Sequence, residues 1–372
     1  MKKTIQTASL ILALLAMAAC SSNSAGTKSA DTSNKLDTSA NGASRAWNKG
    51  GAVQIPEPGK ADGKGIRVGY TGFGQDNPYT QAMAKYIQDE ASRYGAESTF
   101  LGPPTFDPTI QSKILCDAAT SKTYQAMIIL PIDSASVAPC VKQLVEAGVK
   151  VATVQFPAGP DVTADKPQIA GLTTQIREDV LLNARTIGEG VVKGCEGIDP
   201  CQVEVLWGVR SLSFDAVKPA AFRKVIASHS NIKVVCETDA NYTENDGRSQ
   251  AADCLSAHPK LNVIASAADE SIKGAESSIR AAGRTFGLGS DDIKLVGAYA
   301  SHYGVKQVAA GKWLQTYFAR PESDSRAAVD LLLAALQGKD VPQDVLTSDL
   351  DDVGVVVDAG ALKSHPGLKG QW

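Results

Sequence analysis

Seven cysteines are the side chains of this sequence whose number and placement predict chemistry most directly. Cys20 ends an apolar run near the start of the chain. The other six are Cys116, Cys140, Cys195, Cys201, Cys236 and Cys254. Six cysteines can pair completely, which suits an oxidising compartment. A metal site is not expected, because the sequence has no Cys-x-x-Cys and its four histidines are scattered. We therefore predict three disulfides, and neither a metal nor another cofactor.

Cys20 is also a candidate for lipidation. Lys2 and Lys3 precede an apolar, small-residue run over residues 8 to 19, which is typical of an export segment and too short for a mature membrane anchor. The ending Met17-Ala18-Ala19-Cys20 resembles the lipobox of bacterial lipoproteins. We expect residues 1–20 to be a signal peptide and the lipidated Cys20 to anchor an extracytoplasmic protein to the cell membrane. Plain secretion, with Cys20 as a spare thiol, is the alternative.

Signatures of catalysis and of nucleic-acid binding are absent from the sequence. It contains no Gly-x-Ser-x-Gly elbow, no phosphate loop and no His placed at a suggestive spacing from a carboxylate. Gly72 and Gly74 follow a candidate strand, but position 77 is Asn where a dinucleotide loop needs a third glycine. A net charge of −3 provides no basic face for nucleic acid. We expect a protein that is not an enzyme and binds no nucleic acid.

The elements that must position the remaining polar and aromatic residues begin after a long polar segment. Residues 21–64 are mostly Ser, Ala, Thr, Asn, Gly and Lys, so they predict a disordered tether. Short apolar runs then alternate with amphipathic stretches such as residues 83 to 94. The predicted strands are 66–70, 125–130, 149–154, 202–207, 232–236, 262–266, 293–297 and 313–318.

Strands that alternate with helices predict doubly wound parallel sheets. Because the pattern restarts after Leu172, we expect two similar α/β lobes with ligand-binding loops beyond the carboxyl ends of the strands. This topology favours three near-neighbour disulfides. Helices near 110–119 and 134–147 bring Cys116 toward Cys140, and a short turn separates Cys195 from Cys201. The helix after the strand ending at Cys236 contains Cys254.

The order of these segments resembles the type I periplasmic binding proteins, and within them the ribose- and galactose-binding branch that serves ABC sugar importers. The likeness covers nearly all of residues 65 to 345. It depends on six stretches in the family's order: 66–79, 126–134, 147–154, 263–269, 293–297 and 311–321.

The resemblance implies two lobes joined by a three-strand hinge that close on a solute. The N-terminal lobe would comprise residues 65–172 plus 319–346, and the C-terminal lobe residues 173–318 plus 347–372. It also implies a monomer that delivers a sugar, polyol or sugar-like molecule to an ABC permease with its ATPase subunit.

The resemblance further implies a set of ligand-binding residues. Asn77 matches a sugar-bonding residue of the family, and Tyr79 and Tyr242 match aromatic walls. Departures from the family pattern occur at Gln155-Phe156, Ala216, Ala268, Tyr299 and Ala319, and these remove charge and add aromatic surface. The predicted ligand-binding residues are Phe73, Gln75, Asn77, Tyr79, Gln155, Phe156, Phe214, Asp215, Tyr242, Asp269 and Tyr299.

Several alternatives remain open at this point. The lost charges favour a less hydroxylated, partly apolar or aromatic solute, and a ligand sensor for a membrane receptor would share the fold. Asn77 and Asp269 also stand where helix caps are expected, so either residue has a structural explanation. Phe156 and Tyr299 are alternatively packing residues between the lobes.

Overall fold

The computed structural model of this chain describes residues 45–59 and 63–372. The predicted signal peptide with Cys20, and residues 21–44 of the predicted tether, lie outside the described residues. Within the described ranges no helix is long and apolar enough to cross a membrane.

The first sheet has six parallel strands in the order β11-β5-β4-β3-β1-β2. Their bounds are β1 Arg67–Thr71, β2 Glu97–Phe100, β3 Ala126–Ile129, β4 Lys150–Gln155, β5 Thr174–Arg177 and β11 Asp344–Leu346. Every residue of β3 is buried. Such a continuously apolar strand is expected in a parallel sheet, because helices cover both of its faces.

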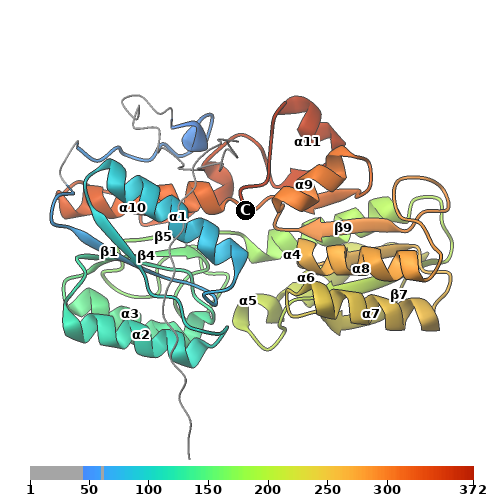
Figure 1. The fold of residues 1–372 in the computed structure, drawn as a ribbon, viewed down its shortest axis with the longest axis horizontal. Helices are drawn as coiled ribbons and strands as arrows, with labels where there is room; N and C mark the ends of the chain where they lie inside the picture. Colours follow the sequence, from blue (N-terminus) through green and yellow to red (C-terminus); the bar gives the residue numbers. More distant parts are fainter. Residues whose placement is uncertain (1–44, 60–62) are drawn as a thin grey trace, which may run out of the picture. The chain divides into compact units, whose positions relative to one another are not determined.

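Two helix pairs cover this first sheet (Figure 1). Helices α1, Pro78–Arg93, and α10, Pro321–Leu336, pack together on one face, and α2, Pro108–Ser121, packs with α3, Ser134–Glu146, on the other. The start of α1 is fixed by Asn77, whose Oδ1 accepts the Thr80 N–H at 3.0 Å. This cap places the loop after β1 at the carboxyl edge of the sheet.

The second sheet has the order β12-β10-β9-β8-β6-β7, in which only β12 is antiparallel to its neighbour. Its strands are β6 Cys201–Trp207, β7 Ile232–Asp239, β8 Val263–Ser266, β9 Lys294–Ala298, β10 Gln315–Tyr317 and β12 Val356–Val357. Its principal helices are α4 Val180–Gly194, α6 Lys218–Ile226, α7 Glu244–Ala257 and α8 Asp269–Ala281. Helices α4 and α6 pack together, as do α7 and α8. The shorter elements are η1 Ala46–Asn48, α5 Ser213–Ala216, α9 His302–Ala309, η2 Thr347–Asp349 and α11 Ala359–Ser364.

The predicted fold of two doubly wound parallel sheets is therefore confirmed, with one boundary moved. Strand β5 pairs with β4 and β11 of the first sheet, so the first crossing to the second sheet follows Arg177 and not Leu172. The chain returns between β10 and α10 and crosses again between β11 and β12. The boundary was misplaced because the four-residue strand β5 has no distinct apolar run of its own.

All three predicted disulfides are present. Cys116 in α2 is bonded to Cys140 in α3, and the two Cα atoms are 4.8 Å apart. The other two bonds are Cys195–Cys201 and Cys236–Cys254. Since each bond joins elements that are close in the chain, the bonds reinforce the packing within each sheet and do not link one sheet to the other.

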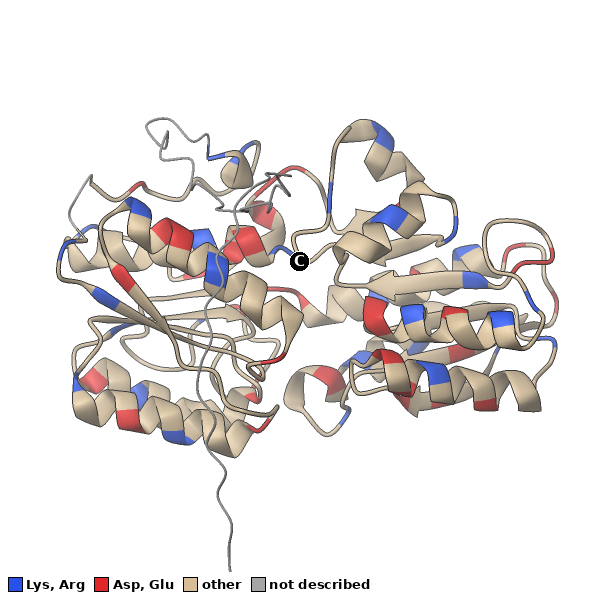
Figure 2. Ribbon diagram, in the orientation of Figure 1, with Lys and Arg blue, Asp and Glu red and all other residues tan. Residues whose placement is uncertain are grey.

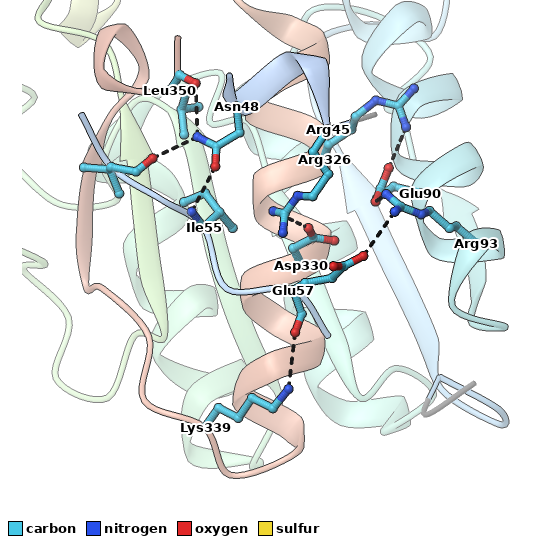
Figure 3. A network of polar contacts seen from close by, with 11 residues as sticks. Arg45, Asn48, Ile55, Glu57, Glu90, Arg93, Arg326, Asp330, Lys339 and Leu350 are labelled. Atoms are coloured by element: carbon cyan, nitrogen blue, oxygen red, sulfur yellow. Dashed lines mark hydrogen bonds and ion pairs between the residues drawn. The ribbon is translucent and has the colours of Figure 1, made fainter. Parts of the chain in front are cut away.

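Residues 45–59 are folded, which corrects the prediction that the tether extends to residue 64. Figure 3 shows this segment against α10: the Arg45 guanidinium pairs with the Asp330 carboxylate at 2.8 Å. Asn48 donates to the carbonyls of Val53 and Leu350 and accepts the N–H of Ile55. The polar composition of the segment concealed this packing, because its few apolar and amide side chains find buried partners in α10 and the chain near residue 350.

Charged residues of both signs are interspersed on the outer helices (Figure 2). Pairs one helical turn apart, such as Lys85–Asp89 on α1 and Lys113–Asp117 on α2, are exposed and offset each other. The described surface therefore has the mixed charge expected from the small net charge of the sequence.

Candidate functional site

Seven loops at the carboxyl ends of strands surround one cavity. Three loops follow β1, β2 and β4 of the first sheet, and four more follow β6, β7, β8 and β9 of the second, so both sheets contribute. The cavity has a volume of about 530 Å³, which suits a small molecule. The carboxyl edge is also where parallel α/β sheets place their ligand sites, because consecutive loops converge there.

Aromatic residues are the largest group of side chains on the cavity wall. They are Phe73, Tyr79, Phe106, Phe156, Phe214, Tyr242, Tyr299 and Trp372. Phe156 of the first sheet's loops stacks on Phe214 of the second sheet's loops, with ring centroids 4.2 Å apart and planes 7° from parallel. Tyr79 and Tyr299 also meet across the cavity, at 6.4 Å. These rings connect the two halves of the protein, one built on each sheet, and they also form the surface that a ligand would contact.

The polar side chains on the cavity wall are amides, carboxylates and one threonine. They are Asp76, Asn77, Gln155, Asn241, Thr243, Glu244 and Glu270, and no lysine or arginine lines this cavity among residues 45–59 and 63–372. Burial raises the pKa of Glu270 to about 8, and the neighbouring Asp269 adds to the effect. The carboxylate of Glu244 is paired with Lys273 at 2.8 Å and with Arg248 at 3.1 Å. Apolar contact therefore dominates the wall.

Behind the rings lies a buried network centred on Lys218. Its Nζ pairs with the Asp215 carboxylate at 3.0 Å and donates to the Tyr299 hydroxyl at 3.0 Å. The Tyr242 hydroxyl donates to Asp215 at 2.6 Å, and the Tyr299 hydroxyl donates to Glu178 at 3.2 Å. Because the hydroxyl of each ring is bonded to a buried charged group, the orientation of both tyrosines is fixed before any ligand arrives.

Burial dominates the electrostatics of this network. Desolvation raises the pKa of Glu178 to about 7, and the nearby Lys218 ammonium partly opposes the rise. It also raises the pKa of the Tyr242 and Tyr299 hydroxyls well above the usual tyrosine value, so both remain neutral donors.

The backbone at the cavity adopts an uncommon conformation. Of the non-glycine residues with positive φ in the described chain, Gln155 ends β4, and Asn241, Tyr242, Tyr299 and Ala300 follow β7 and β9 at this edge. The φ angles of Gln155, Tyr242 and Tyr299 are 65°, 59° and 78°. Each such residue costs about 1–3 kcal/mol and persists only where surrounding contacts offset that cost, and such residues cluster at functional sites. The network around Lys218 supplies that enforcement for both tyrosines.

The structure brings eight of the eleven predicted ligand-binding residues to the cavity wall. These are Phe73, Asn77, Tyr79, Gln155, Phe156, Phe214, Tyr242 and Tyr299. Asp215 lies behind the wall in the network of Lys218. Asp269 is buried and accepts from Ser301 and Thr316, so it organises the second sheet. Gln75 bonds to the Gly102 carbonyl at 2.7 Å and does not line the cavity.

The sequence prediction omitted several wall residues. Phe106 lies in the loop after β2, a strand that was not predicted, and Val209 and Asn241 follow predicted strands but were not among the predicted ligand-binding residues. Trp372 comes from beyond the last strand and lines the cavity next to Tyr79. Trp372 lies outside the repeating pattern of strands and helices, so its position in the sequence did not indicate a place at the cavity.

No group of three or more His, Cys, Asp or Glu side chains suited to a metal ion occurs in the part of the chain that the structure describes.

Comparison with known proteins agrees with this geometry. Residues 68–340 match the family model described as "Periplasmic binding protein domain". The chain is 27% identical over 57% of its length to a D-ribose/D-allose-binding protein of Pseudomonas aeruginosa, and the match covers 62% of that protein. It is 23% identical over 72% of its length to the ribose import binding protein of Salmonella typhimurium, covering 83% of that protein. Less than two thirds of the Pseudomonas protein is therefore matched.

The fold is similar to that of a solved Mycobacterium smegmatis protein in complex with β-D-fucofuranose. The TM-score is 0.69 at 20% identity, and the likeness covers 81% of this chain and 94% of the other. At this identity the likeness extends to the fold alone.

Proposed function

The chain belongs to the periplasmic binding protein family, and from this premise we propose that it binds one small solute in the aromatic cavity and delivers it to an ABC permease. The proposal depends on one observation: loops from both sheets converge on a single cavity in which Tyr242 and Tyr299 are fixed in place by hydrogen bonds. A site built from two halves couples occupancy to the arrangement of the halves. A partner permease would recognise that arrangement.

We propose a sugar, polyol or sugar-like molecule as the solute. The matched Pseudomonas and Salmonella proteins, a D-ribose/D-allose-binding and a ribose import binding protein, support this class. Aromatic rings such as Tyr79 and Tyr242 stack on the apolar face of a sugar, and Asn77 and Gln155 offer amides to its hydroxyls. No catalytic role is proposed, because the relatives are binding proteins.

A second candidate is a less hydroxylated, partly apolar or aromatic solute. The wall favours it, because eight aromatic rings and no basic side chain line the described cavity. A sugar with many hydroxyls would leave several of them without partners on such a wall, which lowers affinity. A ligand sensor that docks on a membrane receptor would use the same cavity, and a neighbouring permease gene would argue for import instead.

The proposal includes a location outside the cytoplasm, with the chain attached to the membrane through lipidated Cys20 and acting as a monomer. The three disulfides support an oxidising compartment.

Thermal-shift measurement followed by calorimetry tests the solute class. The panel is D-ribose, D-allose and myo-inositol, set against small aromatic acids such as p-hydroxybenzoate. A true solute at about 100 times its Kd stabilises the protein by about 2.7 kcal/mol. A shift with sugars supports the first candidate and a shift with aromatic acids alone supports the second. Binding that persists when Tyr79 and Tyr242 are both changed to Ala would place the solute outside this cavity.

A further inference from the structure

Residues 370–372 make hydrogen bonds to helices of the first sheet. The Tyr86 hydroxyl on α1 donates to the Gln371 carbonyl at 2.8 Å. The N–H of Glu322, in the first turn of α10, donates to the Gln371 Oε1 at 2.8 Å. Two helices on the same face of that sheet therefore hold one residue from both its backbone and its side chain.

The same short segment is bonded to the second sheet. The His302 N–H donates to the Trp372 carbonyl at 2.8 Å, and the Trp372 indole N–H donates to the Tyr299 carbonyl at 2.7 Å. Gly370 packs directly on this loop, since a Cβ atom there would lie 2.4 Å from the His302 nitrogen. Only glycine permits this approach.

Between these two sets of bonds, the Trp372 indole forms part of the cavity wall. Its ring stands edge-on to Tyr79 of the first sheet, with centroids 5.3 Å apart and planes at 78°. Its N–H holds the carbonyl of Tyr299, one of the residues with positive φ. A single side chain thus touches a wall residue from each half.

We propose that residues 370–372 form a clasp that holds the first sheet with its helices and the second sheet with its helices together at the cavity, and that Trp372 contacts the solute as part of its wall. The second statement rests on the proposed function, whereas the first does not. Separating the halves requires loss of either the bonds to Tyr86 and Glu322 or the bonds to His302 and Tyr299. The clasp therefore biases the protein toward the arrangement in which the cavity wall is complete, and so raises affinity by reducing the cost of closure.

The clasp is tested first without any solute. Spin labels at Lys113→Cys on α2 and Ser249→Cys on α7 report the distance between the halves. We expect Trp372→Ala, and separately Tyr86→Phe, to shift the distance distribution to longer values. Tyr86→Phe is informative because Tyr86 does not line the cavity, so it breaks one clasp bond and leaves the wall intact.

Tyr303→Phe is the matched control. It removes one tyrosine hydroxyl that donates to Glu276 on α8 at 2.9 Å. Tyr303 follows His302 in the chain, but this hydroxyl bond is not one of the clasp bonds and the side chain does not line the cavity. We expect it to leave the distances unchanged. Distances that are the same in Trp372→Ala, Tyr86→Phe and the parent would overturn the clasp.

The wall role of Trp372 is tested with D-ribose as the probe. Trp207 and Trp313 are fully buried and Trp47 is nearly so, hence a change in tryptophan fluorescence on binding should come from Trp372. We expect Trp372→Phe to abolish that change and Trp372→Ala to weaken calorimetric binding ten-fold or more, with Tyr303→Phe like the parent. Unchanged fluorescence response and affinity would refute the wall role. Failure of the parent itself to bind D-ribose counts against the proposed sugar function, while the distance measurement still decides the clasp.

Discussion

Lys218 is fully buried, and its charged group contacts protein side chains and does not line the cavity. Its ammonium group is neutralised by Asp215 and fixes the Tyr299 hydroxyl. A buried charge is tolerated only when it is paired and hydrogen-bonded, and here both conditions are met. The arrangement explains how a cavity lined by many aromatic rings can hold Tyr242 and Tyr299 in defined orientations.

Tyr242 is the wall residue whose removal should be most informative. Its ring lies 6.4 Å from both Phe214 and Tyr299, and its hydroxyl is bonded to Asp215. Tyr242→Ala removes the ring contact and part of the apolar surface, so we expect solute affinity to fall roughly ten-fold or more. Calorimetry measures the change, and circular dichroism checks that the variant is folded. Affinity equal to that of the parent would mean that this ring is not part of the solute site.

Glu204 is a buried acid that lies outside the cavity. It lies within β6, is fully buried, and neither carboxyl oxygen has a hydrogen-bond partner among the described residues. Burial raises its pKa to about 8, with Asp253 adding to the effect. Between about pH 4.5, the ordinary pKa of a glutamate, and about pH 8, Glu204 therefore keeps its proton in the folded protein and loses it in the unfolded chain. The free energy of unfolding decreases as pH rises through this window.

Glu204→Gln should remove this dependence. The variant keeps the shape of the side chain without a charge, so we expect it to exceed the parent in stability by about 1 to 3 kcal/mol at about pH 8.5 and to match it at about pH 4, where Glu204 is protonated in both states. Urea unfolding at the two pH values measures the difference. Glu178 and Asp269, whose pKa values burial raises to about 7, should retain part of the decrease in the variant. Parallel pH profiles of the two proteins would contradict this account.

At the scale of elements, strand ends and helix starts determine where the site lies. Asn77 begins α1 as its cap and still lines the cavity, so the helix-cap and ligand-site interpretations of this residue are compatible. Asp269 is the opposite case, because its bonds to Ser301 and Thr316 tie α8 to β10 and the start of α9. Both residues stand at the carboxyl end of a strand, but only one of them reaches the cavity.

The segment 45–59 should contribute measurably to stability. Asn48→Ala removes three hydrogen bonds and leaves buried backbone groups without partners, so we expect a loss of about 2 kcal/mol. Differential scanning calorimetry should find a lower Tm. Gln54→Ala is the matched control, since its single amide bond to Gly51 is exposed. Equal melting of both variants would mean that the segment adds nothing to the folded body.

At the scale of the whole molecule, eight strands were predictable, most of them because buried parallel strands are continuous apolar runs. The strands that escaped prediction are β2, β5, β11 and β12, and length alone does not explain this, because β3, β8 and β10 are also at most four residues long. Strand β2 also alternates polar and apolar residues at the sheet edge. Such strands are held by pairing with their neighbours, so their own residues carry little signal.

The cavity was predictable only in part, for a similar reason. Residues directly after a predicted strand, such as Phe73 and Tyr299, follow from the rule that loops at carboxyl ends form the site. Lys218 and Trp372 do not, because their roles depend on contacts with distant residues. A lysine at the start of a helix is ordinarily exposed, and only Asp215 and Tyr299 together keep this one buried.

Lipidation of Cys20 would attach the whole molecule to the membrane, and one substitution tests this attachment. Cys20 follows an apolar export-like run, and the lipid chains of a modified cysteine would hold an otherwise water-exposed body at the bilayer. Cys20→Ala should therefore move the protein from the membrane fraction to the soluble extracytoplasmic fraction. Ser21→Ala, which keeps the cysteine, is the control and should remain with the membrane. Disulfide formation should be equal in the two variants, since none of the three bonds involves Cys20. Immunoblots of the separated fractions measure the distribution, and a Cys20→Ala protein that stays with the membrane at parental level would rule out this anchor.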